Sequence, residues 1–294
     1  MHFYFTARCR IGRVTGGQSP VVRQIAGEHR LPACCFRQLA ENGRVGKLPT
    51  RAGRLPAVPR TGSMIISHKY RFIFIKTAKT AGTSIEVFLS KQCGSTDIVT
   101  PIFPSVEGHQ SRNYKGFINP IPAIVERPHK IVSALHSAFI SRDKFYNHMP
   151  ASLVKRRVPR RVWNSYLKFS VERNPWDKVL SHYYMHAARE GGSLSLDEYL
   201  TRGRFPINYF RYTDDSGAKI IVDRVLHFEN LAADLSEVFL QLNVPFDGTL
   251  GVKAKSEYRT DRRPYQLVFN DKQRRIVDNA FAREIELHGY RFEP

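Results

Sequence analysis

Cysteine, acidic side chains and long apolar runs are all scarce in this chain of 294 residues. Its four cysteines form no CxxC pair and show no metal-ligand spacing, which excludes a disulfide scaffold or a cysteine-based zinc module and favours a reducing compartment. No apolar run approaches the roughly 20 residues that a membrane-spanning helix needs. Residues 1–13 are charged too early for a secretory signal, so we expect a cytoplasmic protein without a membrane anchor.

The 26 Asp and Glu residues are outnumbered by 46 Lys and Arg, so that the net charge is +20. Such a charge favours anionic partners: nucleic acid, anionic membranes, phosphorylated cofactors or acidic polysaccharides. The basic side chains are not interleaved with aromatic ones as in single-strand nucleic-acid binders, so we expect no specific nucleic-acid partner. With 42% hydrophobic residues, the composition is that of a soluble globular protein.

The N-terminal part is the most basic. Residues 1–63 carry eleven Lys or Arg and only two acidic residues, and they show neither helical nor strand periodicity. Gly, Pro and Arg are spread through them, as in segments that cannot bury a core. We expect this segment to be disordered, or to be a non-native extension that precedes a natural start at Met64. Residues 64–294 then form the globular domain.

From residue 64 onward, apolar strand patterns alternate with helical ones, which is typical of an α/β fold with a central parallel sheet. The expected strands are residues 71–76, 168–172 and 219–228. The expected helices are residues 83–92, the segment after Pro175, residues 229–243 and residues 270–290. Asn270 or Asp271 would cap the last helix and Gly289 would end it.

The segment "TAKTAGTS", residues 77–84, joins the first of these strands to the first helix. Backbone N–H groups and the helix dipole meet an anion at such a junction. Gly82 allows a close turn of the backbone, and the side chains suited to an anion are those of Lys79, Thr80, Thr83 and Ser84. The lysine precedes the glycine by three residues, whereas a Walker A lysine follows its second glycine, so the sequence disfavours an ordinary nucleotide kinase.

A second motif follows about ninety residues later, where the strand "FSVE" leads into "RNPW" and a helix. Arg173 at the strand end offers a bidentate fork to a phosphate, and Ser181 lies two helical turns further on. Together, "KTAGTS" and "RNPWDKVLS" resemble the two-part signature of sulfotransferases that use 3′-phosphoadenosine 5′-phosphosulfate (PAPS). The resemblance runs from about Met64 to the C-terminus and is nearest to carbohydrate sulfotransferases and their bacterial relatives.

This resemblance implies a three-layer, P-loop-like fold with a parallel sheet flanked by helices. It implies transfer of a sulfuryl group from PAPS to a hydroxyl of a saccharide acceptor, without a metal. The residues that it assigns to the 5′-phosphosulfate are Lys79, Thr80, Ala81, Gly82, Thr83 and Ser84. It assigns the 3′-phosphate to Arg173 and Ser181. Sulfuryl transfer needs a base and a cation at the leaving oxygen, and we expect Lys79 to be that cation.

For the base, the resemblance indicates His148. In the carbohydrate branch a histidine ahead of a short helix, followed by the Arg-Asn-Pro motif, serves as base. The segment "NHMPASLVKRR" matches this arrangement, although Met149-Pro150 replaces the commoner small polar pair. His109 is the alternative base and Glu107 a weaker one.

Structural interpretations compete with several of these roles. Arg173 could be an ion-pair partner of Glu172 or Asp177, Ser181 a packing residue, and His148 a helix-capping residue. Residues without an assigned catalytic role are Lys76, His182, His186, Lys253, Lys255 and the basic run 155–161. For the whole protein, the alternatives are an ATP-dependent kinase on the same core and a non-catalytic basic protein that binds nucleic acid or acidic glycan. The sequence specifies neither the acceptor nor the oligomeric state.

Overall fold

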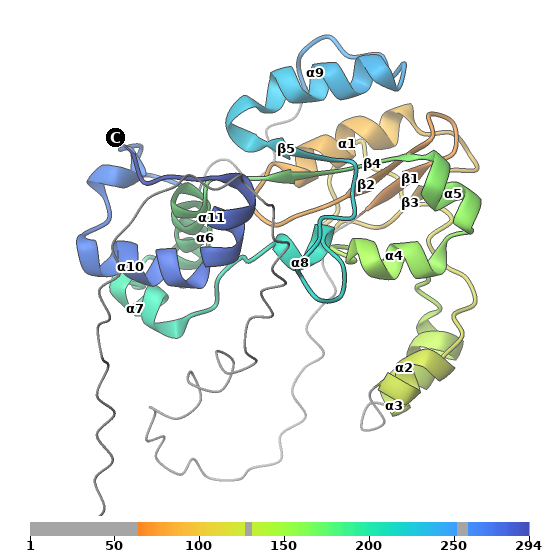
Figure 1. The fold of residues 1–294 in the computed structure, drawn as a ribbon, viewed down its shortest axis with the longest axis horizontal. Helices are drawn as coiled ribbons and strands as arrows, with labels where there is room; N and C mark the ends of the chain where they lie inside the picture. Colours follow the sequence, from red (N-terminus) through yellow and green to blue (C-terminus); the bar gives the residue numbers. More distant parts are fainter. Residues whose placement is uncertain (1–63, 127–130, 252–257, 294) are drawn as a thin grey trace, which may run out of the picture. The chain divides into compact units, whose positions relative to one another are not determined.

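The computed structural model describes residues 64–126, 131–251 and 258–293. The expected extension, residues 1–63, lies outside these described residues, as do Lys253 and Lys255. The described chain is a mixed α/β structure built on a five-stranded sheet of order β3-β1-β2-β4-β5 (Figure 1). The strands are β1 (Ile65–Ser67), β2 (Phe72–Ile75), β3 (Ile98–Val99), β4 (Leu167–Glu172) and β5 (Arg224–His227).

The helices agree in place with most of those expected. They are α1 (Gly82–Gln92), α2 (Ile121–Glu126), α3 (Ile131–Leu135), α4 (Ala151–Arg157), α5 (Arg160–Ser165), α6 (Pro175–Arg189), α7 (Leu196–Arg202), α8 (Tyr209–Tyr212), α9 (Leu231–Gln241), α10 (Asp271–Ala280) and α11 (Ala282–His288), with a π-helical segment at His136–Ser141 and 3₁₀ turns at Phe228–Asn230 and Tyr265–Leu267. None of the helices in the described ranges combines the length and apolarity needed to cross a bilayer.

The sheet is mixed, which corrects the expectation of a parallel sheet. β2, β4 and β5 are parallel to one another, with Glu172 opposite His227 at the end of the last pair. β1 is antiparallel to both β2 and β3. Only residues 68–71 join β1 to β2, and a parallel pair would need a crossover of a dozen or more residues, so the chain returns as an antiparallel hairpin.

Helices cover both faces of the sheet. On one face, α1 and α9 pack against the strands in an apolar cluster that contains Phe74, Ile85 and Phe239. On the other face, α4, α5 and α8 pack in a cluster that contains Ile73 and Trp163. Figure 1 shows α1 and α9 together on one side, and α4 and α8 on the other. Burial of both faces explains why β2 is a continuous apolar run, while the neighbouring β4 also buries polar side chains, those of Lys168, Ser170 and Glu172.

The start of α6 follows the local sequence closely. The side chain of Asn174 accepts hydrogen bonds from the N–H groups of Trp176 and Asp177, and Pro175 occupies the first turn. α10 likewise begins with a capping box of Asn270.

The single helix expected at residues 270–290 is wrong, because the chain breaks between α10 and α11 at a buried phenylalanine.

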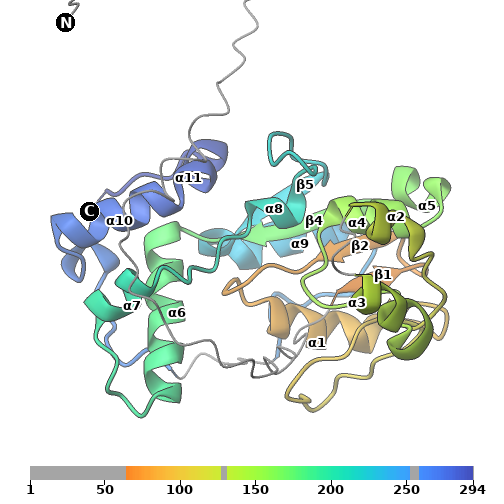
Figure 2. The same cartoon turned by 90° about the horizontal axis from the view of Figure 1, so that it is seen from below.

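A third apolar cluster joins α6, α7, α10 and α11 beyond the end of β4. Figures 1 and 2 both show this group at the opposite end of the sheet from α2 and α3. Since β2, β4 and β5 are parallel, the segments that follow Ile75, Glu172 and His227 all leave the same edge of the sheet. In open α/β sheets this carboxyl edge is where ligands bind.

Candidate functional site

A cavity of about 1900 Å³ lies at this carboxyl edge, and both sequence motifs line it. Its basic lining residues are Lys76, Lys79, Arg173, Arg189, Arg204, Arg211, Arg259 and Arg262. No Asp or Glu of the described chain lines it. The charge therefore selects an anionic ligand. The volume exceeds the roughly 300–1,000 Å³ of a site for one drug-sized molecule, which leaves room for two ligands.

The loop after β2 has a backbone conformation suited to an anion. Lys79 and Ala81 have φ angles of 62° and 56°, in a left-handed region that costs a non-glycine residue roughly 1–3 kcal/mol. α1 then begins at Gly82, and no described side chain caps its N-terminus. Alternating left-handed residues and an uncapped helix start direct main-chain N–H groups toward an anion. The backbone of the loop, as well as its lysine, is therefore suited to an anion.

The three hydroxyls that the sequence assigns to an anion have different surroundings. Thr80 is wholly buried, and its Oγ1 lies 2.8 Å from Oγ1 of Thr77. Oγ1 of Thr83 accepts a hydrogen bond from Nζ of Lys76 at 3.2 Å. Ser84 lines the cavity and is buried. The hydroxyls of Thr80 and Thr83 thus stabilise the loop itself, and both residues still line the cavity.

Lys76, which had no assigned role, joins β2 to α1. Its Nζ lies 2.6 Å from Oε2 of Glu86 on α1, and both side chains are buried. The stem of the lysine crosses Gly82, where an added Cβ would lie only 2.7 Å from Cγ of Lys76. Glycine is needed at this position because the lysine passes so close to the backbone.

Arg173 lies where the second motif meets the loop. Its Nη2 is 2.5 Å from Oδ2 of Asp177, so the ion pair with Asp177 that the sequence offered as an alternative role is present. Its Nη1 also donates to the main-chain oxygen of Lys79 at 3.1 Å, and its guanidinium stacks on the ring of Phe228 at 4.1 Å. Asp177 pairs with Arg259 as well. Two guanidinium groups therefore share one carboxylate and keep an excess of positive charge beside the cavity.

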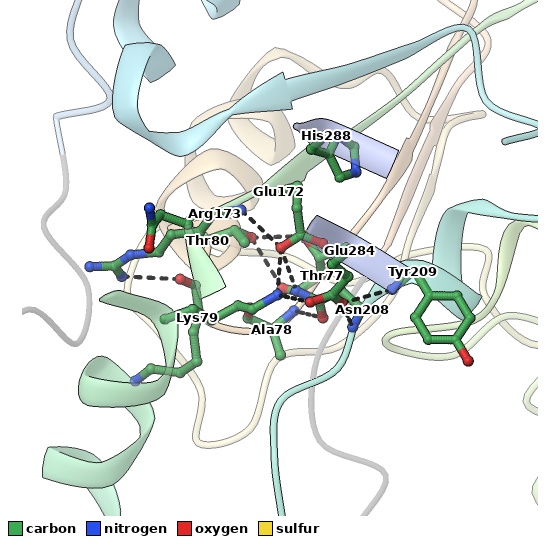
Figure 3. A network of polar contacts seen from close by, with 12 residues as sticks. Thr77, Ala78, Lys79, Thr80, Glu172, Arg173, Asn208, Tyr209, Glu284 and His288 are labelled. Carbon is green, nitrogen blue, oxygen red and sulfur yellow. Dashed lines mark hydrogen bonds and ion pairs between the residues drawn. The ribbon is translucent and has the colours of Figure 1, made fainter. Parts of the chain in front are cut away.

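Lys79 and Ser181 approach the same cavity from the loop and from α6. The side chain of Lys79 extends toward α6 (Figure 3), and its Nζ lies 3.7 Å from Sδ of Met185. Ser181 lies one turn before Met185 on that helix. Lys79 and Ser181, from the two sequence motifs, thus line one cavity.

His148 lines the cavity directly before α4, as expected from the sequence. Its Nδ1 lies 3.1 Å from the main-chain oxygen of Lys76. A carbonyl oxygen only accepts hydrogen bonds, so in the neutral ring Nδ1 carries the proton and Nε2 carries the lone pair. Arg211 donates from Nη1 to the main-chain oxygen of His148 at 2.6 Å. The neutral histidine is therefore held as the Nδ1–H tautomer.

The two alternative bases lie outside the cavity lining. His109 is half-buried, and burial, together with the charges of Lys76 and Arg112, lowers its pKa to about 4. Glu107 is exposed. Geometry thus favours His148 over both.

Several lining residues carried no sequence signal. Two of them, Arg259 and Arg262, lie in the segment "EYRTDRR", which matches no motif and stands out in the sequence only by its basic character. His182, which had no assigned role, lines the cavity, and its Nδ1 lies 2.7 Å from the hydroxyl of Tyr199. The basic run 155–161 does not contribute to the lining. Among the described residues, no three His, Cys, Asp or Glu side chains form a group that could hold a metal ion.

Comparison with known proteins gives one relationship. Neither a protein-family model nor a solved structure matches the chain. An uncharacterized protein of Archaeoglobus fulgidus is 33% identical over 117 residues, which are 38% of this chain and 98% of the archaeal protein. The chain therefore belongs to the same family as this uncharacterized archaeal protein.

Proposed function

We propose that this protein is a sulfotransferase that moves the sulfuryl group of PAPS to a hydroxyl of a saccharide acceptor. The observation that carries the proposal is the convergence of the two motifs on one cavity with eight basic and no acidic lining side chains among the described residues. A nucleotide with phosphate groups at both its 5′ and 3′ positions needs two anion sites joined by an apolar surface. The cavity supplies both kinds of surface.

Three groups of residues would fit the three parts of PAPS, which are the 5′-phosphosulfate, the 3′-phosphate and the adenine. The main chain of residues 79–84 and the ammonium of Lys79 would hold the 5′-phosphosulfate. Arg173 and Ser181 would hold the 3′-phosphate. Phe228 and other apolar lining residues offer a surface for the adenine, and these are Leu231, Leu235, Phe246 and Leu250. When bound, PAPS supplies an activated sulfuryl group on a phosphate leaving group.

Two residues do the chemistry in this proposal. His148 removes the proton of the acceptor hydroxyl through Nε2 while the oxygen–sulfur bond to the acceptor forms. Lys79 donates to the phosphate oxygen on which negative charge develops as the old sulfur–oxygen bond breaks. The products are a sulfate ester, 3′-phosphoadenosine 5′-phosphate (PAP) and a proton on His148. The preformed loop and the Nδ1 hydrogen bond of His148 lower the cost of reaching this arrangement.

The test is transfer of radiolabelled sulfate from PAPS to a panel of glycans and small alcohols by the full chain. Titration with PAP and with ATP separates the alternatives, because Arg173 and Ser181 suit a 3′-phosphate that ATP lacks. We expect labelled product and a clear preference for PAP. A preference for ATP without sulfate transfer would favour the kinase alternative and overturn the proposal. The full chain could also be tested for binding of nucleic acid or glycan. If deletion of residues 1–63 abolishes such binding and leaves PAP binding intact, residues 1–63 are the segment that binds it.

A further inference from the structure

The loop that carries Lys79 is held by a residue that lies 130 positions away in the sequence. The N–H of Ala78 donates to Oδ1 of Asn208 at 2.9 Å, and Nδ2 of Asn208 donates to the main-chain oxygen of Ala78 at 3.1 Å. Asn208 is wholly buried and does not line the cavity. One side-chain amide thus binds both polar main-chain groups of the residue that precedes Lys79, as Figure 3 shows.

Asn208 is itself fixed by two buried carboxylates. Its Nδ2 lies 3.3 Å from Oε1 of Glu172, the last residue of β4. Its main-chain N–H donates to Oε1 of Glu284 on α11, and the N–H of Tyr209 donates to the same oxygen at 3.0 Å. The position of Asn208 is therefore set by a strand end and by a helix from a distant part of the chain (Figure 3).

A single lysine holds the two carboxylates together. Nζ of Lys178, on α6, lies 2.7 Å from Glu172 and 2.7 Å from Glu284, and all three side chains are wholly buried. The hydroxyl of Tyr212 donates to the second oxygen of Glu172 at 2.9 Å. Removal of one partner from such a cluster leaves a buried charge uncompensated, so the cluster permits little movement. We call Glu172, Lys178 and Glu284 the buried ionic cluster.

We propose that Asn208 is a positioning residue of the anion loop, residues 77–84, and that the buried ionic cluster holds it in place. This inference rests on the proposed function. Asn208 would keep Lys79 and Ala81 in their left-handed conformation, so that the loop N–H groups and the lysine meet the 5′-phosphate. Asn208 bonds the loop at Ala78, whereas Arg173 bonds it at Lys79 and Ser181 lies on α6, so loss of the Asn208 side chain should act on the 5′-phosphate end much more than on the 3′-phosphate end.

The experiment compares three nucleotides by calorimetry on the full chain: PAP, 3′-AMP, which lacks the 5′-phosphate, and 5′-AMP, which lacks the 3′-phosphate. The affinity ratio of PAP to 3′-AMP measures the contribution of the 5′-phosphate, and the ratio of PAP to 5′-AMP that of the 3′-phosphate. In Asn208→Ala we expect the first ratio to fall about tenfold, because the charge-assisted bonds of the loop are lost. The second ratio should not change.

The control is Ser170→Ala, since the buried Ser170 hydroxyl donates to the main-chain oxygen of Ile75 at 2.8 Å, close to the loop. This variant should lose thermal stability and keep both ratios. If Asn208→Ala does not fold, Asn208→Ser introduces no charge, keeps one hydroxyl and should lower the first ratio alone. A fall of both ratios by the same factor, or of neither, overturns the inference. A wild-type chain that binds PAP no better than 3′-AMP overturns the proposed function instead.

Discussion

Arg173 donates a hydrogen bond from Nη1 to the main-chain oxygen of Lys79, 3.1 Å away, across 94 positions of sequence. The residue that identifies the second motif is thereby bonded to the lysine of the first. Asn208 holds the preceding residue, Ala78, through both of its main-chain groups. The strained turn is thus fixed from two directions, which explains how Lys79 keeps a left-handed backbone without being a glycine.

His148→Ala should reduce turnover by about 10²- to 10⁴-fold, because the proton acceptor for the attacking hydroxyl is removed. Affinity for PAP should stay unchanged, since the 5′- and 3′-phosphate residues remain. Sulfate-transfer kinetics and calorimetry measure the two quantities separately. His109→Ala is the matched control and should keep full turnover. Full activity in His148→Ala, with loss in His109→Ala, would show that the base was assigned to the wrong histidine.

Ser181→Ala should lower the affinity for PAP about tenfold, because a hydrogen bond to a charged phosphate contributes on the order of 1.5 kcal/mol. Affinity for 5′-AMP, which lacks that phosphate, should be unaffected. The control is Ser195→Ala, which removes the cap of α7, since Ser195 accepts from the N–H of Glu198. That variant should lose about 1 kcal/mol of stability and keep its PAP affinity. An equal loss for PAP and 5′-AMP would assign Ser181 to packing.

Lys76→Met should lower the free energy of unfolding by about 3–5 kcal/mol, because it leaves the Glu86 carboxylate buried without its lysine. The double variant Lys76→Met with Glu86→Leu should recover much of that loss, since neither charge is then buried. Urea denaturation of the two single variants and the double variant gives the coupling energy. Strictly additive losses would contradict a stabilising role for the pair.

Acid should destabilise the protein through its buried histidines. Burial, followed by the charges of His186, Lys79 and Arg189, lowers the pKa of His182 to about 3. The unfolded chain binds this proton near pH 6.5 and the folded chain only near pH 3, so unfolding takes up a proton between these values. The free energy of unfolding should therefore fall as the pH drops below about 6.5.

The measurement is the urea midpoint between pH 7.5 and pH 5, compared for the wild-type chain and His182→Gln. The variant has no ionisable group at this position, so its midpoint should depend less steeply on pH. An unchanged slope would show that His182 does not contribute to the acid sensitivity.

Local patterns predicted the main elements correctly. β2 is an unbroken apolar run, β4 carries apolar residues at every second position, α1 follows its loop directly, and Asn174-Pro175 starts α6 as its capping chemistry requires. The β1–β2 hairpin was missed because its turn has no glycine, and Arg71 adopts a positive φ of 58° there. The break at Phe281 was missed because the apolar helical pattern continues through it, whereas the backbone of this buried residue leaves the helical region at φ −109° and ψ 16°.

The sequence by itself determined the strand–loop–helix junction, the RNPW helix start and the position of His148 before α4, because these depend on neighbouring residues. Only the tertiary structure decided that Asn208 holds Ala78, that Lys76 pairs with Glu86, and that His148 points Nδ1 at a carbonyl. The contacts of Asn208 and His148 join residues 130 and 72 positions apart. They form only when the parallel register of β2, β4 and β5 brings three strand ends to one edge, which no local pattern encodes.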